Sequence, residues 1–482
     1  MARLSSGLMR TNQTRCRFAL FALIGVTAGC APISLSAAQQ PKPESGADWR
    51  KAEAGILDGW VQLTFSDRFV KAGESYFSPD DSKIIFQAVE KPANGATPDD
   101  FYAMFVADVA YDAATGRIAG IEHIKRLSPP GSANTCGWFH PSNPNTVIFA
   151  STIGKPTQKE APGFQRGGVY KWMFPPEMRI VECDLAKADG TANTLKTIAG
   201  DGKAYTAEGS FSPDGRYLLY CSLESGEGDL FVNDLQTGRK TRLVQARGYD
   251  GGPFFSPDGR RICYRSDRDG DNLLQIYVAD LAFNDKGEIT GVEREIQVTD
   301  EACVNWCPYW TKDGRRLIYA SSILGEMNFE VYMIDADPGN LSGSKGTVKY
   351  GTAKRRITYF DSAGATPASD VLPALSHDGK WMIWTSRRGP DQQVQLWAAR
   401  LALDPDAPWK SAPAVAAKPE PRPEANENRI VVTDPATGRI MIYDMIEHTL
   451  SEYDPRTHKL TPLDSDEDAA LFRKLYEQQG GG

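Results

Sequence analysis

The feature that most constrains the fold is a short segment that recurs six times, 44 to 72 residues apart. Its fullest form is Phe-Ser-Pro-Asp-Gly, in which Pro and Asp favour a tight turn and Gly supplies the positive φ that closes it. A unit that repeats at this spacing indicates a repeat architecture. The six copies begin at Tyr76, Trp138, Ser210, Phe254, Tyr309 and Ala374.

Each copy is followed by further strand patterns. A short apolar stretch such as 261–265 comes after the turn, then an alternating stretch such as 275–280, and after most of these a polar-alternating stretch such as 295–299. Four antiparallel strands repeated radially make a β-propeller. The sequence therefore predicts an all-β protein, a six-bladed β-propeller of four-stranded antiparallel blades, with a small C-terminal β/α module.

The sixth repeat lacks an outer strand of its own, because after Leu401 the chain enters a stretch rich in Pro and Ala. The segment 60–65, ahead of the first repeat, has the outer-strand pattern and no inner strands before it. We therefore expect this N-terminal segment to close the sixth blade and to join the two ends of the ring.

Shifts in composition divide the chain into five parts. We expect a lipoprotein-type signal peptide at 1–29, an N-terminal tether at 30–59, the propeller at 60–402, a Pro/Ala-rich linker at 403–428 and a small module at 429–482. The module is predicted to hold two or three strands and a helix over 466–478. The same segment is also compatible with a degenerate seventh blade.

The N-terminus predicts export. The first 29 residues contain four arginines and no acidic residue, and the ten residues 18–27 are apolar. A bilayer span needs about 20 apolar residues, so this is the pattern of a signal-peptide core. Cys30 follows small residues in a segment that resembles the bacterial lipobox, which predicts a lipid anchor on Cys30 and a periplasmic location in the bacterial cell envelope. The alternative is ordinary cleavage after Ala37 or Ala38, with Cys30 discarded.

The repeats resemble those of the TolB-like β-propeller family, a WD-like repeat. The resemblance covers about residues 60–402 and rests on the turn motifs with Tyr249-Asp-Gly-Gly-Pro, Asn305-Trp-Cys-Pro and Ser266-Asp-Arg-Asp-Gly. About 30 residues separate Cys30 from the first blade, which leaves no room for the α/β domain and TolA-contacting segment of TolB itself. The resemblance implies a non-enzymatic, lipid-anchored scaffold that binds an envelope protein or peptide, with a peptidoglycan-associated protein among the candidates.

The charge balance argues against one class of partner. The chain has 54 Lys and Arg against 62 Asp and Glu, a formal net charge of −8. An acidic surface repels phosphate backbones, so we expect no nucleic acid. No second long apolar stretch follows the leader, so membrane contact is expected only through the lipid anchor. We expect a monomer and no cofactor.

Catalytic and metal-binding signatures are missing from the sequence. It contains no Gly-x-Ser-x-Gly elbow, no phosphate-binding loop and no His-Glu-x-x-His motif. Asp267, Asp269 and Asp271 have the spacing of a calcium loop, but the glycine and the final Glu are misplaced, so a hairpin tip is expected. His140 and His377 occupy turn positions. We therefore predict no metal site.

Six cysteines remain beyond the leader and Cys30. Cys303 and Cys307 invite a disulfide or zinc interpretation. Four extended residues span about 13 Å, however, beyond the Cα separation of about 7 Å that a disulfide tolerates. No His or Cys cluster completes a metal site, so we expect buried free thiols.

Alignment of the six copies indicates a candidate binding site. Five residues upstream of the residue before each turn, polar side chains stand on or just before the inner strand, where equivalent positions surround one mouth of a propeller channel. We predict a polar funnel there that accepts a peptide segment or small ligand. The alternative is that these groups bond only the turns and channel water. The predicted funnel residues are Asn134, Thr206, Asp250, Asn305 and Asp370.

Two further candidates stay open. Asp250 and Asp370 could face each other as the acid pair of a glycosidase, which would make the protein a channel-sited polysaccharide hydrolase or lyase. The blade-two insertion 151–178 is long, and long loops at the edge of a scaffold favour binding. The alternative for the insertion is that it packs Trp172 and Phe174 on the neighbouring blade.

Overall fold

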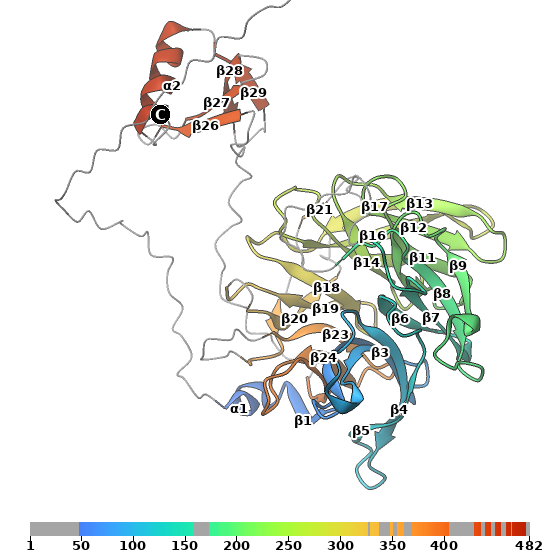
Figure 1. The fold of residues 1–482 in the computed structure, drawn as a ribbon. Helices are drawn as coiled ribbons and strands as arrows, with labels where there is room; N and C mark the ends of the chain where they lie inside the picture. The colour runs from blue at the N-terminus through green and yellow to red at the C-terminus, as the bar shows by residue number, and fades with distance from the viewer. Residues whose placement is uncertain are drawn as a thin grey trace, which may run out of the picture. The chain divides into compact units, whose positions relative to one another are not determined.

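The computed structural model describes residues 48–158, 173–325, 328–336, 348–349, 354–360, 369–403, 429–434, 439–444, 449–454, 459–463 and 465–478. The predicted leader, Cys30, the linker 404–428 and most of the blade-two insertion lie outside these residues. The described part consists mainly of β-strands (Figure 1). It contains no helix that is long and apolar enough to cross a membrane.

Six antiparallel blades form the propeller, and each begins with an inner strand. The inner strands are β2 (Phe69–Phe77), β6 (Asn134–His140), β10 (Thr206–Phe211), β14 (Asp250–Phe255), β18 (Asn305–Trp310) and β23 (Val371–Leu375). The second strands are β3 (Lys83–Glu90), β7 (Asn143–Ser151), β11 (Tyr217–Ser222), β15 (Arg261–Ser266), β19 (Arg316–Ser321) and β24 (Trp381–Ser386).

The third and outer strands complete each blade. The third strands are β4 (Ala103–Tyr111), β8 (Arg179–Asp184), β12 (Asp229–Asp234), β16 (Gln275–Phe283), β20 (Glu330–Asp335) and β25 (Gln395–Leu401). The outer strands are β5 (Ile118–Arg126), β9 (Leu195–Ala199), β13 (Lys240–Val244), β17 (Ile289–Gln297), β22 (Arg355–Arg356) and β1 (Leu57–Gln62). A short strand, β21 (Val348–Lys349), adds to β17 in parallel, which the repeats did not predict.

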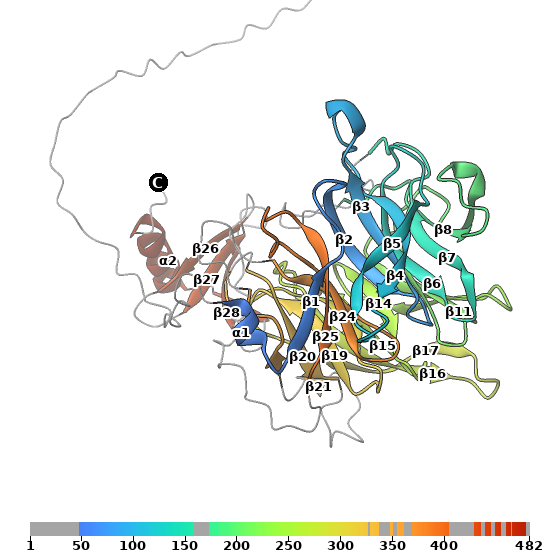
Figure 2. The same ribbon diagram turned by 90° about the horizontal axis from the view of Figure 1, so that it is seen from below.

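The ring closes as the sequence predicted. The inner strands contact one another in the order β2, β6, β10, β14, β18, β23 and back to β2. Figure 2 shows β1 beside β24 and β25 of the sixth blade. In the sixth blade, β1 pairs antiparallel with β25, with Leu57 opposite Leu401 and Gln62 opposite Trp397. The strand begins three residues earlier than expected, and α1 (Trp49–Glu53) precedes it. The propeller thus includes residues that the sequence assigned to the tether at 30–59.

The repeated turn has a mechanical role. In blade four the Ser256 hydroxyl donates to the Asp258 carboxylate at 2.6 Å, and the same carboxylate accepts the backbone N–H of Arg260 at 3.0 Å. Gly259 closes the turn with φ of 68°. In blade one this glycine is replaced by Asp81, which holds a φ of 58°. The turn geometry therefore persists where its sequence departs from the motif.

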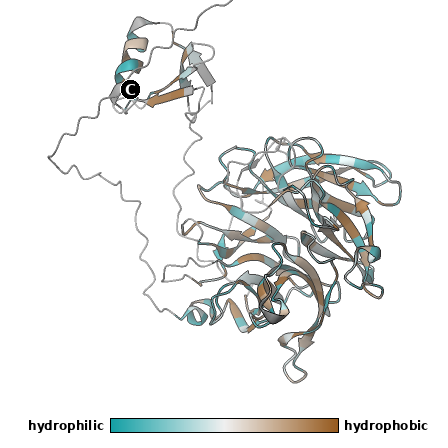
Figure 3. Cartoon of the chain, in the orientation of Figure 1, coloured by the Kyte–Doolittle hydropathy of each residue, from teal (hydrophilic) through white to brown (hydrophobic). Residues whose placement is uncertain are grey.

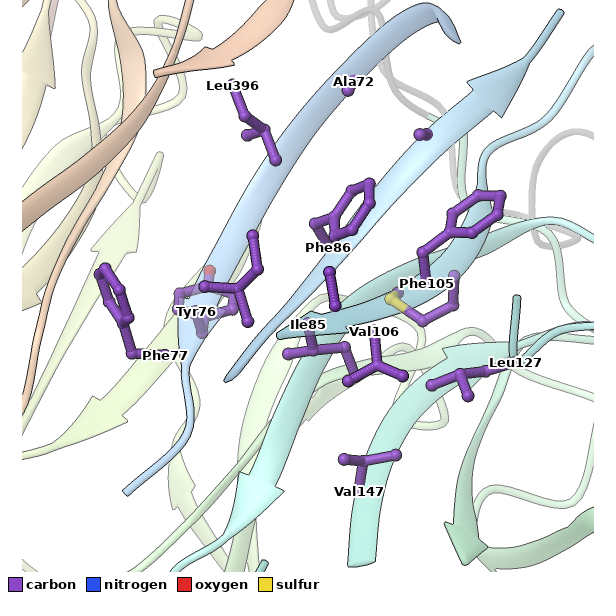
Figure 4. Packing of buried hydrophobic residues seen from close by; sticks show 14 of the residues in the cluster. Ala72, Tyr76, Phe77, Ile85, Phe86, Phe105, Val106, Leu127, Val147 and Leu396 are labelled. Atoms are coloured by element: carbon purple, nitrogen blue, oxygen red, sulfur yellow. The ribbon is translucent and has the colours of Figure 1, made fainter. Parts of the chain in front are cut away.

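Hydrophobic residues recur along the strands of the propeller (Figure 3), and many of their side chains are buried in the core. In blade one, Phe69, Phe86 and Phe105 lie with ring centroids 5.3 to 5.8 Å apart. Leu396 of blade six and Val147 of blade two belong to the same buried cluster (Figure 4). The core is thus shared between neighbouring blades, which holds each inner strand in a fixed position.

The C-terminal module is a four-stranded antiparallel sheet with one helix. Its strands are β26 (Arg429–Thr433), β27 (Ile440–Asp444), β28 (Thr449–Asp454) and β29 (Lys459–Pro462), followed by α2 (Asp466–Gln478). Phe472 and Leu475 of α2 pack with Val432 and Met441 of the sheet. The module therefore has the β/α composition that the sequence predicted, with four strands in place of two or three.

Candidate functional site

Every inner strand carries a β-bulge at which one residue adopts a left-handed conformation. The register with the second strand shifts at this point in all six blades. The φ angles lie between 39° and 61°, a region that residues other than glycine rarely adopt. Such strain persists where the surrounding structure enforces it and is common at functional sites. The six bulge residues are Glu74, Cys136, Glu208, Gly252, Cys307 and Leu372.

All six bulge residues line one cavity of about 540 Å³. Phe101 and Tyr102, from the connection between β3 and β4, form part of its wall. Met173 and Pro175 of the blade-two insertion and Ser369, just ahead of β23, form other parts. The volume is in the range of small-molecule and peptide-segment sites. Equivalent positions of six repeats thus converge on one candidate binding cavity.

The cavity has an aromatic floor. Tyr76, Trp138 and Phe254, which begin three of the turn motifs, line it. Tyr309, from a fourth motif, joins them, and the ring centroids of these four side chains lie 5.1 to 6.2 Å from one another. Aromatic rings packed at this distance stabilise each other and leave little space between them. The four rings therefore form one packed cluster, the aromatic floor.

The Glu208 carboxylate is surrounded by hydrogen-bond donors. Tyr205 donates to it at 3.3 Å and the Arg265 guanidinium at 3.1 Å, and the Tyr249 hydroxyl and the Gly252 backbone N–H also donate to it. A Cβ on Gly252 would lie 1.9 Å from the Arg265 guanidinium, which explains glycine at this bulge. Glu208 and Arg265 thus form a buried ion pair that fixes one wall of the cavity.

Glu74 has a different environment. Its carboxylate accepts the hydroxyls of Tyr76 at 3.2 Å and Thr135 at 2.9 Å and the backbone N–H of Cys136 at 3.3 Å. These donors are neutral, and among the described residues no Lys, Arg or His lies within ion-pair distance of this carboxylate. Glu74 is only 9% exposed. On the neighbouring strand, Gln87 also lines the cavity, and its Oε1 is buried without a hydrogen-bond partner.

Two thiols line the cavity. Burial, followed by the nearby carboxylates of Glu74 and Glu208, raises the pKa of Cys136 well above its usual range. Burial also raises the pKa of Cys307 to about 12. Both side chains are therefore protonated thiols at neutral pH, and the thiol is a poor nucleophile. The six cysteines of the described residues are all free, as predicted.

The structure places four of the five predicted funnel residues at the start of their inner strands and Asp370 directly ahead of β23, and all five are buried. Asn134 donates to two backbone carbonyls at 2.9 Å, Thr206 shares a hydrogen bond of 3.0 Å with Ser222, and Asn305 donates to Gln275 at 2.9 Å. Of the five, Asn134 alone lines the cavity. These polar groups thus hold strands and loops together, and their role in binding stays a prediction.

Asp250 and Asp370 do not form an acid pair in the cavity. Each is fully buried beside an arginine of its own blade, Arg268 for Asp250 at 3.3 Å and Arg388 for Asp370. Burial raises the pKa of Asp250 to about 6, against the opposing effect of Arg268. Neither carboxylate lines the cavity. Both residues are therefore positioned to pin their blades.

Two carboxylates of the inner strands that line the cavity were not predicted from the sequence. Glu74 and Glu208 stand two positions downstream of Ala72 and Thr206 in the same alignment. That alignment places two glutamates at equivalent positions of different repeats, which is the signal that could have found them. The bulge that turns these positions toward the cavity depends on how the inner strand pairs with the second strand, which the alignment does not show.

The end of the blade-two insertion reaches the cavity. Residues 159–172, with Trp172, lie outside the described residues. Phe174 is buried, and its ring meets Tyr205 and Tyr249 edge-on with centroids 4.9 and 5.3 Å away. Phe174 thus packs on a neighbouring blade, which was the alternative to a binding role for the insertion. Because Met173 and Pro175 line the cavity, the insertion also contributes to the candidate site.

The other sequence candidates are structural. Asp267, Asp269 and Asp271 lie in the hairpin connection between β15 and β16, as predicted. The His140 ring packs on Phe211 with centroids 4.8 Å apart. Within the described ranges, no group of three or more His, Cys, Asp or Glu side chains is arranged to hold a metal ion.

Residues 182–354 match the family model described as the TolB beta propeller domain. This part of the ring is therefore TolB-like. This TolB-like propeller is also similar to an uncharacterized protein of Agrobacterium fabrum, with 30% identity over 150 residues. That match covers 29% of this chain and 47% of the relative, so the chain spans about half the length of the curated protein it matches.

Two solved structures illustrate the range of similar folds. TolB from Acinetobacter baumannii is 18% identical, with a TM-score of 0.41, over 66% of this chain and 64% of that chain. Oligogalacturonate lyase from Vibrio parahaemolyticus is 12% identical, with a TM-score of 0.38, over 71% of this chain and 93% of that chain. Likeness at this level concerns the fold of the TolB-like propeller and says nothing of its ligand.

Proposed function

We propose that this TolB-like propeller is a non-enzymatic binding scaffold of the cell envelope that receives a partner segment or small ligand in the cavity lined by the six bulge residues. One observation carries the proposal. The bulge residues of all six blades converge on one cavity, and five of them hold a left-handed conformation without being glycine. Backbone strain of this kind destabilises a fold. A preorganised binding site is a reason for the strained conformations to be kept.

The proposal includes a location, the periplasm, with a lipid anchor on Cys30. Its support is the arginine-rich leader with its apolar run 18–27 and the lipobox-like segment that ends at Cys30. One acyl chain binds membranes weakly, whereas two or more anchor firmly. We expect a fatty-acid probe to label the wild-type protein and not the Cys30→Ala variant. Unchanged labelling and fractionation of that variant would count against the lipid anchor.

Recovery of a partner from envelope extract tests the cavity. Ser369 lies on the cavity wall and is partly exposed, so Ser369→Trp places a large ring in the space without removing a buried contact. The matched control is Gln236→Trp, which adds the same ring to an exposed turn that does not line the cavity. We expect Ser369→Trp to lose the partner and Gln236→Trp to retain it. Equal recovery by both variants would place the binding surface elsewhere.

A cavity-sited polysaccharide hydrolase is the second candidate, because Glu74 and Glu208 line the same space. A glycosidase needs two carboxyl groups that are free to meet the substrate. Both oxygens of Glu208 already accept donors from the protein, which favours the scaffold over the enzyme. The enzyme would be favoured instead if the wild-type protein released reducing ends from envelope polysaccharide and the Glu74→Gln variant did not.

A further inference from the structure

We infer that the cavity selects a cationic group, an alkylammonium or a guanidinium, of the kind that a basic side chain presents. The inference rests on the proposed function, because it names the ligand chemistry of the same cavity. Three neighbouring features of the cavity carry it: the carboxylate of Glu74, the amide of Gln87 and the aromatic floor.

The first feature is a buried carboxylate without a cation. Glu74 accepts hydrogen bonds from two hydroxyls and one backbone N–H, which solvate its charge in part. In a site with little water, a carboxylate gains much more from a cation than from neutral donors. The other buried carboxylate of the cavity, Glu208, already has Arg265. A ligand cation beside Glu74 would complete the same arrangement.

The second feature is an unsatisfied acceptor close by. In the pairing of β2 with β3, Gln87 lies opposite Gly73, and the register shifts at the next residue, Glu74. Gln87 is 8% exposed and its Oε1 has no hydrogen-bond partner. Buried acceptors of this kind are rare and call for a donor. An ammonium group carries three donors, enough for the carboxylate, this amide oxygen and a water molecule.

The third feature is the aromatic floor next to the carboxylate. The Tyr76 hydroxyl bonds Glu74, and the Tyr76 ring lies 5.1 Å from Trp138 and 5.4 Å from Phe254. The faces of aromatic rings attract cations, most strongly where water is excluded. The methylene groups of a basic side chain can also pack on these rings. The floor therefore suits both the charge and the stem of such a side chain.

The remaining charges of the wall agree with this assignment. Lys71 lies over the Tyr102 ring at 4.4 Å, and Arg265 is paired with Glu208. The charged residues that line the cavity are three carboxylates and two cations, with Asp100 as the third carboxylate. An anionic ligand seated on the floor would face Glu74 directly. Electrostatic complementarity thus favours a cation.

Titration calorimetry with the purified full chain tests the inference. The probes are butylammonium, an acetyl-Gly-Lys-Gly-amide peptide, and the same peptide with norleucine or glutamate in place of lysine. We expect the lysine peptide to bind at least about tenfold more tightly than the norleucine and glutamate peptides, because a charge-assisted hydrogen bond is lost in both. Similar affinity for all three peptides would overturn the cation assignment.

Variants locate the cation. Glu74→Gln removes the charge and keeps the shape, and we expect it to weaken the lysine peptide about 10- to 100-fold at an unchanged melting temperature. The control is Asp112→Asn, an exposed turn carboxylate that does not line the cavity, for which we expect a change below about threefold. If Glu74→Gln does not fold, Gln87→Leu serves in its place, with an expected loss of about three- to tenfold. Unchanged affinity in the folded variant would show that the site does not bind the cation.

The probes also separate the two sources of a basic group. Tighter binding of the lysine peptide than of butylammonium would support a protein segment as the ligand, and equal binding would support a free amine. If no probe binds at concentrations up to about 10 mM, the cation inference is wrong. The proposed function fails independently, if the envelope partner is retained by Ser369→Trp.

Discussion

The Asp81 carboxylate accepts the backbone N–H of Asp378 at 2.9 Å, across the junction between the first and sixth blades. The same carboxylate accepts the backbone N–H of His377 at 2.7 Å. Asp81 occupies the position that glycine takes in four of the five sister turns. The aspartate that replaces glycine in the first repeat therefore links the first blade to the sixth and helps to close the ring.

Replacement of Asp81 by glycine tests this contact. Glycine suits the φ of 58°, so Asp81→Gly removes the carboxylate without backbone strain. We expect the free energy of unfolding to fall by about 1–3 kcal/mol, because two N–H groups lose their acceptor. Urea denaturation measures it. The control is Asp112→Ala, an exposed turn carboxylate with local partners only. An equal effect of the two substitutions would mean that the contact adds nothing to closure.

Truncation tests the role of β1. A chain that begins at Gly46 keeps α1 and β1, and we expect it to melt like the longer protein. A chain that begins at Thr64 lacks β1, so it exposes the edge of β25 and loses the ladder hydrogen bonds between them. We expect it to melt at a lower temperature and to aggregate. The same melting temperature and solubility for both chains would contradict closure by β1.

The buried Asp250 predicts a pH dependence of stability. Burial raises its pKa from an ordinary 3.8 to about 6 in the folded protein. Between these values the folded state keeps a proton that the unfolded state loses, so this carboxyl group destabilises the fold as pH rises from about 4 to about 6. Arg268, at 3.3 Å, stays charged throughout this window.

Comparison with Asp250→Asn isolates this effect, because asparagine does not titrate. We expect the stability of the wild type relative to the variant to decrease by about 1–3 kcal/mol between pH 4 and pH 6, as measured by urea denaturation at each pH. A constant difference across that range would show that Asp250 titrates at its ordinary value.

Substitution of a predicted funnel residue tests whether these residues stabilise the fold or bind the partner. Asp370 is fully buried and contacts Arg388, which also bonds Glu53 of α1 at 3.0 Å. We expect Asp370→Ala to lower stability by about 3–5 kcal/mol, because it leaves a buried charge without one of its partners. The folded fraction should still recover the envelope partner. Loss of the partner at an unchanged melting temperature would instead support the polar funnel as a binding site.

The sequence alone determined the repeat and its consequences. Six turn motifs, each followed by strand patterns, predicted the blades, and the missing outer strand after Leu401 predicted the pairing of an N-terminal segment with β25. These predictions succeeded because turn chemistry and strand alternation are local properties. Side chains such as Ser256 and Asp258 form hydrogen bonds within their own turn, so the sequence of each copy is sufficient to specify its turn.

The tertiary structure alone decided which side chains line the cavity. Strict alternation along an extended strand would place Asp250 and Gly252 on the same face. The bulge at Gly252 breaks this relation, so Gly252 lines the cavity while Asp250 is buried beside Arg268. Bulges depend on how a strand pairs with its neighbour, and burial depends on the adjacent blade. That is why the carboxylates of Glu74 and Glu208 became a candidate site only once the ring was assembled.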